Sequence, residues 1–347
     1  KKWNGIFSKM KCFKNILFLI MISCFLTNQA QDPLFTQFFS NALYLNPAMA
    51  GRDLSPRIHT TYRNQWPGIN KAYVTYNLEY DQFAPDLHGG VGFQVMHDRT
   101  GNGLLNTLQF SGCYAYQLLI NREWTLNFGV KASFVQKSFN WGEAIWGDQL
   151  DPSRGNINTS NQPQGNNANY VDFSNGLILF GKNLFVGAAF NHLTRPNESF
   201  LYNTNVNASD KLAIRSSFHG GYKIRILQNG LFHKELFVTP EFVFDFQSNF
   251  KRLNFGTYFV DGIFDLGFWY RHTRIQDANN EGFAAQDAIV IVFGIEKNNL
   301  KFGYSYDFNL SNLISSSVGA HEISITLDIP SKIEPSTKFR VINCPQF

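Results

Sequence analysis

The stretch WTLNFGVKASF, residues 124–134, decides the fold class, because apolar and polar side chains alternate through all of it. Even positions from Trp124 to Phe134 are apolar, whereas odd positions from Thr125 to Ser133 are polar or glycine. Successive side chains of a β-strand point to opposite faces. The stretch therefore predicts a strand with one apolar face and one polar face.

The same alternation recurs along the chain, and it predicts fourteen strands. They span residues 57–66, 72–83, 89–98, 104–119, 123–137, 171–180, 184–193, 211–226, 234–247, 251–260, 262–272, 286–296, 299–308 and 320–329. Many have about the 9–11 residues that a tilted transmembrane strand needs, and their number is even. Together they predict an all-β fold, a transmembrane antiparallel β-barrel of about 14 strands.

The connections support the barrel over a soluble β-sandwich. The long ones, 138–170, 194–210, 273–285 and 309–319, all follow odd-numbered strands, and those after even-numbered strands are mostly tight turns. This asymmetry is typical of outer-membrane barrels, and it places both termini on the short-turn, periplasmic side. Sandwich strands usually have five or six residues and are shorter than these. We therefore expect the protein to lie in the outer membrane of a Gram-negative bacterium.

Residues 1–30 have the pattern of a signal peptide. Five lysines and no acid accompany an apolar run at 16–26, which is too short to span a bilayer as a helix. The alternative is a degenerate lipoprotein site ending at Cys24. The remaining chain has 25 basic and 26 acidic residues, so it does not suit a basic nucleic-acid binder. The whole sequence has 16% aromatic and only 16% charged residues, which is not the composition of a disordered chain.

The expected organisation has four parts. A signal peptide (1–30) precedes an N-terminal lead-in (31–56), the barrel (57–329) and a tail (330–347). The lead-in and the tail lack alternation, so we expect both outside the barrel, facing the periplasm. Cys113 and Cys344 remain after the leader, and their separation supports neither a disulfide scaffold nor a zinc site.

No motif predicts catalysis, a cofactor or a metal. His321-Glu322 lacks the second histidine of a zinc helix and lies in a predicted strand. The His-Gly-Gly sequences at 88–90 and 219–221 are typical of an oxyanion loop, but no nucleophile elbow accompanies them. The acidic loop 277–282 does not have calcium-loop spacing. We therefore expect a protein that is not an enzyme, without cofactor or metal, although an outer-membrane hydrolase stays an alternative.

Charged side chains of both signs fall on the inward positions of the predicted strands. The candidates are Glu79, Asp81, Lys131, Lys137, Glu241, Asp245, Asp265, Arg271, Lys301, Asp307, Glu322 and Asp328. One interpretation is an interior of hydrogen bonds and ion pairs, and the other is a lumen that accepts a polypeptide. In strand 286–296 the inward residues Ala288, Val290 and Val292 are apolar instead, so we expect them against a plug or an inserted segment.

An ordered series of short segments resembles the PorP/SprF family. The opening DPLFTQ (32–37), LYLNPA (43–48) and AG (50–51) are followed by NHL (191–193), HGGYK (219–223), GFWYR (267–271), KFGYSYD (301–307), GAHEIS (319–324) and INCPQF (342–347). The resemblance covers essentially all of residues 31–347. It identifies no partner-binding residue, because the family has no short binding motif that we can match.

The resemblance implies an outer-membrane protein of type IX secretion and gliding motility. Its implied partners are a secreted surface protein or adhesin with a type B C-terminal domain, periplasmic secretion components and outer-membrane lipid. The hypothesis is a barrel that receives and anchors this cargo, with loops 138–170 and 194–210 engaging it. The alternative is a channel for small solutes.

Overall fold

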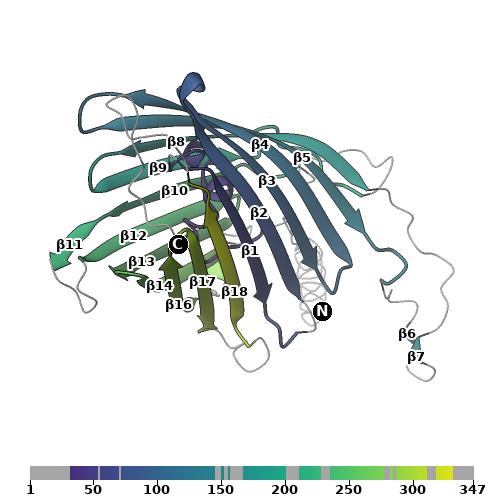
Figure 1. The fold of residues 1–347 in the computed structure, drawn as a ribbon. Coiled ribbons are helices and arrows are strands. Elements are labelled where there is room, and N and C mark those ends of the chain that lie inside the picture. Colours follow the sequence, from purple (N-terminus) through teal and green to yellow (C-terminus); the bar gives the residue numbers. More distant parts are fainter. Residues whose placement is uncertain are drawn as a thin grey trace, which may run out of the picture.

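The computed structural model describes a closed antiparallel barrel of fourteen strands (Figure 1). The described residues are 32–53, 55–69, 72–144, 150–151, 155–156, 167–200, 211–227, 235–276, 282–283, 287–310 and 318–330. The sheet closes because its first strand pairs with both its second and its last, all three antiparallel. Closure leaves no unpaired sheet edge, which a bilayer would not tolerate.

The bounds of the fourteen strands agree with the expected segments to within a few residues. They are β1 (Arg57–Gln65), β2 (Tyr73–Ala84), β3 (Gly89–Thr100), β4 (Leu105–Leu119), β5 (Thr125–Phe139), β8 (Ala168–Phe180), β9 (Leu184–Asn191), β10 (Arg215–Tyr222) continued by β11 (Ile224–Leu227), β12 (Leu236–Gln247), β13 (Phe250–Asp261), β14 (Phe264–Gln276), β16 (Ala288–Lys297), β17 (Leu300–Asn309) and β18 (Ala320–Asp328). β10 and β11 both pair with β12 and form one interrupted strand. Two-residue strands β6 (Leu150–Asp151), β7 (Gly155–Asn156) and β15 (Gly282–Phe283) lie in the long connections. The predicted barrel is confirmed.

Two bounds differ by four residues: β10 begins at Arg215 instead of residue 211, and β14 ends at Gln276 instead of residue 272. The second difference has a reason in the sequence of β14. Beyond Arg271 its exposed positions carry His272 and Arg274, while Thr273 is buried. The strand therefore continues past Arg271 with polar residues on both faces. The expected bound depended on apolar residues at the outward positions, and these are missing there.

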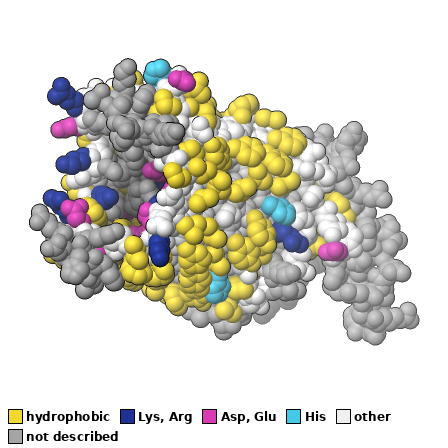
Figure 2. Space-filling view, viewed as in Figure 1, with side chains coloured by type: hydrophobic (Ala, Val, Ile, Leu, Met, Phe, Trp, Pro, Cys, Tyr) yellow, Lys and Arg dark blue, Asp and Glu magenta, His cyan; other side chains and the backbone are white. Residues whose placement is uncertain are grey.

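Apolar side chains cover the outer face of the barrel. Figure 2 shows them as a broad band over the strands, with few charged groups within it. Exposed rings and branched chains such as Phe128, Val130 and Phe134 on β5 alternate with the buried Asn127, Lys131 and Ser133. An outward apolar surface with a polar interior fits a barrel in lipid.

The lead-in lies inside the barrel, and the expectation that it lies outside is wrong (Figure 1). Its helix α2 (Ala42–Leu45) and 3₁₀ turn η1 (Pro47–Met49) have buried side chains. No helix among the described residues is long and apolar enough to cross a membrane. The segment has no period-two pattern, so its sequence showed only that it is not a strand.

An apolar core joins the lead-in to the barrel wall. It includes Phe38, Phe39, Leu45 and Met49 of the lead-in together with Trp269, Val290 and Val292 of the wall. The rings of Phe38 and Trp269 lie 5.2 Å apart. Val290 and Val292 are therefore inward apolar residues in the same buried cluster as an inserted segment, as we expected for this strand.

Candidate functional site: a vestibule above the plugged lumen

The lead-in crosses the lumen from one end to the other. Its last residues reach the short-turn end, where Arg57 of β1 pairs with both Asp53 and Asp81. Its first described residue, Asp32, lies at the opposite end, beside His192 in the connection after β9. We call this opposite end the long-loop end. The lead-in is therefore a plug that begins near the long loops.

Two acidic wall residues hold the upper part of the plug by its backbone and by a hydroxyl. The N–H groups of Thr36 and Gln37 donate to the Glu322 carboxylate at 2.7 and 2.9 Å. The Thr36 hydroxyl lies 2.9 Å from the Asp307 carboxylate. Arg63 forms ion pairs with both acids, and all five residues are buried. Thr36 is held by acceptors from two neighbouring strands.

Helix α2 is held from the wall in the same way. Glu79 of β2 accepts hydrogen bonds from the N–H groups of Leu43 and Tyr44 at 3.1 and 3.2 Å. On the other side Lys131 donates to the Leu43 carbonyl at 3.3 Å. The backbone polar groups of this short helix are thus satisfied by charged wall residues.

Glycines in the wall let the plug come close. A Cβ atom at Gly129 would lie 2.2 Å from the Ala48 nitrogen, and one at Gly90 would lie 2.0 Å from the Ala50 carbonyl oxygen. No such atoms could coexist without movement of the backbone. Gly90, which belongs to one of the two His-Gly-Gly sequences, thus admits the plug backbone.

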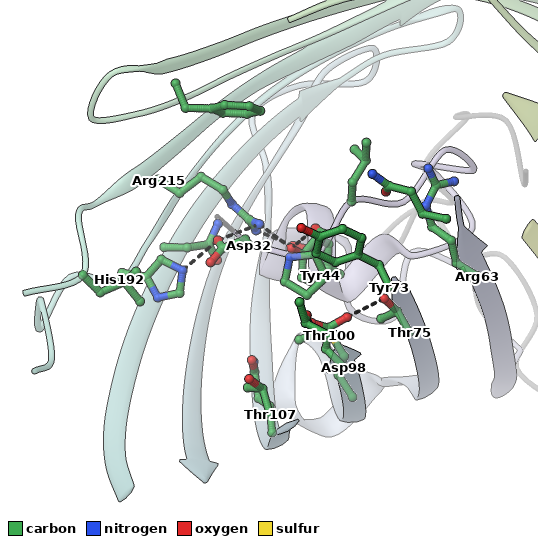
Figure 3. Close-up of a pocket in the computed structure, with 18 of the residues that line it drawn as sticks. Asp32, Tyr44, Arg63, Tyr73, Thr75, Asp98, Thr100, Thr107, His192 and Arg215 are labelled. Carbon is green, nitrogen blue, oxygen red and sulfur yellow. Dashed lines mark hydrogen bonds and ion pairs between the residues drawn. The ribbon is translucent and has the colours of Figure 1, made fainter. Parts of the chain in front are cut away.

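Above the plug, at the long-loop end, lies a cavity of about 470 Å³ that we call the vestibule (Figure 3). Its lining includes Asp32 and Tyr44 of the plug and Lys131, Asn191 and Arg215 of the wall. Charged groups of both signs line it together with apolar side chains such as Met96, Val135 and Leu212. A cavity of this size and mixed lining can hold a small molecule or a few residues of a polypeptide.

Asp32 fastens the start of the plug to the vestibule wall. Its carboxylate lies 2.8 Å from His192 Nε2 and 2.9 Å from Arg215 Nη1, and His192 Nδ1 lies 2.7 Å from Asp172 (Figure 3). Burial opposes the charge of the imidazole, but the carboxylates of Asp32 and Asp172 outweigh it and raise the pKa of His192 to about 9. Burial also opposes ionisation of Asp32, yet His192 and Arg215 hold the pKa of that carboxyl well below its usual range. Both groups are charged at neutral pH.

His192 also adopts an unusual backbone conformation. This residue has a φ of +62°, in the left-handed region that a non-glycine residue seldom adopts. Such conformations persist where the surroundings over-determine them, and they cluster at functional sites. The contacts to Asp32 and Asp172 are the surroundings that hold His192 here.

Of the twelve inward candidates, eleven are buried and Asp328 lies part-exposed at the short-turn rim. Glu79, Asp81, Lys131, Arg271, Asp307 and Glu322 contact the plug. Three others are in ion pairs with further residues: Lys137 with Glu198, Asp245 with Arg252, and Lys301 with Glu296 and Asp328. The two oxygens of Glu241 have no hydrogen-bond partner among the described residues, and Asp265 makes no hydrogen bond or ion pair with the described residues of the plug.

The candidate residues expected from the sequence do not include Asp32, Thr36, Tyr44, Arg63, His192 and Arg215. Arg63 could have been found from the sequence, because it shares the odd positions of strand 57–66 with Arg57, His59 and Thr61. The structure places these four side chains inward. His192 and Arg215 fall within the expected strands 184–193 and 211–226, but β9 ends at Asn191 and β10 begins at Arg215, so both residues lie at the ends of their strands, beside a connection. Nothing in the spacing of Asp32 indicates a partner 160 residues away.

Within the described part of the chain, the remaining motifs do not come together as a metal site. His321 contacts Tyr304 at 2.8 Å, while Glu322 faces the plug. Among the described residues, no group of three His, Cys, Asp or Glu side chains could hold a metal ion. Cys113 is free and buried. Cys344, the tail after residue 330 and residues 277–281 of the acidic loop lie outside the described residues.

A family model described as type IX secretion system membrane protein PorP/SprF matches residues 27–327. The chain belongs to the PorP/SprF family. Family membership and the barrel make it a membrane protein of type IX secretion and point to the outer membrane. They also suggest a structural or secretion role rather than catalysis. No curated protein matches the chain.

Solved barrels resemble this PorP/SprF member in outline only. The CymD monoaromatic hydrocarbon channel aligns over 84% of this chain and 93% of its own, with 10% identity and a TM-score of 0.49. For a TodX monoaromatic hydrocarbon channel mutant the values are 84%, 94%, 11% and 0.48. For the Acinetobacter baumannii outer membrane protein Omp33 they are 80%, 100%, 9% and 0.41.

Proposed function

We propose that this PorP/SprF barrel is a non-enzymatic receptor that binds and anchors a secreted surface protein through its type B C-terminal domain. The observation that carries the proposal is a vestibule at the long-loop end of a lumen that the plug fills below. A cavity closed in this way suits the capture of a segment that arrives from the long-loop side. Loops 138–170 and 194–210 would extend the contact.

The orientation follows from the usual asymmetry of outer-membrane barrels, whose long loops face outward. The vestibule would then open to the cell surface, where a secreted adhesin is displayed. The start of β1 and the end of β18 pair at the short-turn end, so the tail 330–347 would begin in the periplasm. There it would meet the periplasmic secretion components, whereas the plug is largely enclosed.

The test combines a deletion strain with two variants at neighbouring positions on β4. Thr107 lines the vestibule, and Leu108 points to the opposite face. Deletion should abolish surface display of the cognate adhesin while general secretion persists. The wild type and Leu108→Trp should restore display, but Thr107→Trp, which fills the vestibule, should not. Unchanged display in the deletion strain would refute the proposal.

A channel for small solutes is the second candidate, because a cavity of about 470 Å³ lies within the size range of small-molecule sites. The plug argues against free passage, since it fills the lumen with a packed apolar core. Solute uptake by liposomes that contain the purified protein, with no secreted protein copurifying, would favour the channel.

A further inference from the structure

Lys131 is a buried cation without an acidic partner. It is 4% exposed and lines the vestibule from β5. Its ammonium donates to the Leu43 carbonyl at 3.3 Å and lies 6.0 Å from the centre of the Tyr44 ring. Among the described residues, no carboxylate lies within ion-pair distance of it. An ammonium has three donors, and a buried charge is costly unless it is paired.

On the nearby strands β9 and β10, two side-chain N–H groups lack acceptors. Asn191 and Arg215 face each other across β9 and β10, and both are at least nine-tenths buried. Asn191 Nδ2 and Arg215 Nε have no hydrogen-bond partner within the described part of the chain. β8 lies between β5 and β9, and its Ser174, opposite Lys131, also lines the vestibule. Four adjacent strands, β5, β8, β9 and β10, thus place hydrogen-bond donors on one stretch of the vestibule wall.

The plug already shows which ligand chemistry this wall takes. The Asp32 carboxylate binds the Nη1 atom of Arg215 and the His192 ring, the groups next to the unpartnered donors (Figure 3). It leaves Arg215 Nε without an acceptor, and Lys131 with only the Leu43 carbonyl and no carboxylate. Met96, Val135 and Leu212 line the same cavity and offer apolar contact beside a charged group. This combination fits a carboxylate attached to a peptide better than a free inorganic anion.

We propose that Lys131, Asn191 and Arg215 form a binding site for a carboxylate of the partner polypeptide, beside Asp32. The carboxylate can come from an acidic side chain or from the C-terminus of the chain. This inference rests on the proposed function, because it takes the occupant of the vestibule to be a polypeptide. The partner's carboxylate would accept from the Lys131 ammonium and from the two free N–H groups.

The test uses the purified full-length protein in detergent and three N-acetylated glycine peptides. One carries a central aspartate and an amidated end, one has a free C-terminal carboxylate, and one has neither carboxylate. The wild type should bind at least one carboxylate peptide about tenfold or more tightly than the uncharged peptide, as charge-assisted hydrogen bonds predict. Whichever carboxylate peptide binds identifies the source. Equal binding of all three would overturn the inference.

Variants separate recognition from general charge and from folding. Lys131→Met should remove the preference for carboxylate, and Lys131→Arg should keep most of it. Lys301→Met is the matched control, because Lys301 is an equally buried lysine at the short-turn end, near Glu296 and Asp328. If Lys131→Met does not fold, Asn191→Ala should weaken the preference. Preference retained in folded Lys131→Met, or in folded Asn191→Ala, would refute the site.

Copurification of the cognate adhesin from outer membranes distinguishes the two proposals. If the adhesin copurifies with wild type and with Lys131→Met in equal amounts, the carboxylate site is wrong and the receptor function stands. If no adhesin copurifies with the wild type, the receptor function is wrong whatever the peptides do. Loss of the adhesin from Lys131→Met alone, with retention by Lys301→Met, supports both.

Discussion

The two halves of the lumen differ in how the wall meets the plug. Toward the short-turn end, rings and aliphatic chains of plug and wall form one packed core, and Gly129 and Gly90 admit the plug backbone. Toward the long-loop end, charged side chains surround a cavity of about 470 Å³, which the plug lines with its first residues and with Tyr44. The same strands therefore provide a packed anchor at one end and a binding surface at the other.

Between these halves lies the charged network around Thr36, and its loss should have the largest effect on stability. Arg63→Met removes the buried cation that forms ion pairs with both Asp307 and Glu322. This loss should lower the free energy of unfolding by about 3–5 kcal/mol. Denaturant unfolding in detergent measures the loss.

Arg225→Met is the control for Arg63, because Arg225 forms an ion pair with Glu235 in which both side chains are about half exposed. An exposed pair contributes about 0–1 kcal/mol. Similar losses in the two variants would mean that the network around Thr36 does not hold plug and wall together.

The strands could be predicted from the sequence, and the path of the plug could not. Lipid on one side and a polar lumen on the other impose a period of two, which most of the fourteen strands display, with β16 as an exception. The same rule explains why Val290 and Val292 stood out: apolar inward residues need an apolar partner, and the plug core contains them.

The site depended on contacts that local spacing does not encode. Thr36 and Glu322 are 286 residues apart, and Asp32 and His192 are 160 apart. The plug is too short and irregular to show a periodic face. Lys131 was recognised as inward, but its lack of a carboxylate partner depends on the three-dimensional neighbours of β5.

The packed half should be sensitive to a single methyl group. Gly129→Ala places a Cβ atom 2.2 Å from the Ala48 nitrogen, so the plug must shift, at a cost of about 1–3 kcal/mol. Protease cleavage within residues 42–53 should become faster in this variant. Gly112→Ala is the matched control, since a Cβ atom there has no neighbour within 4 Å. Equal cleavage of both variants would contradict close packing of plug and wall.

The vestibule half should respond to pH through the Asp32–His192 contact. The folded-state pKa of His192, about 9, exceeds its usual value of 6.5. The charged imidazole therefore contributes its full share to the stability of the folded protein below about pH 6.5, and this share is lost as the pH rises through 9. The lowered pKa of Asp32 keeps that carboxylate charged throughout this range. We expect a contribution of about 1 kcal/mol, because both side chains stay partly open to solvent.

The measurement compares the thermal unfolding midpoints of wild type and His192→Gln from pH 6 to 10. The difference should be largest near pH 6 and should vanish above pH 9, because only the imidazolium pairs with Asp32 and Asp172. A difference that stays constant with pH would mean that His192 acts by packing alone. In that case Arg215 would be the residue that holds Asp32 at the vestibule, and the start of the plug would stay fastened at alkaline pH.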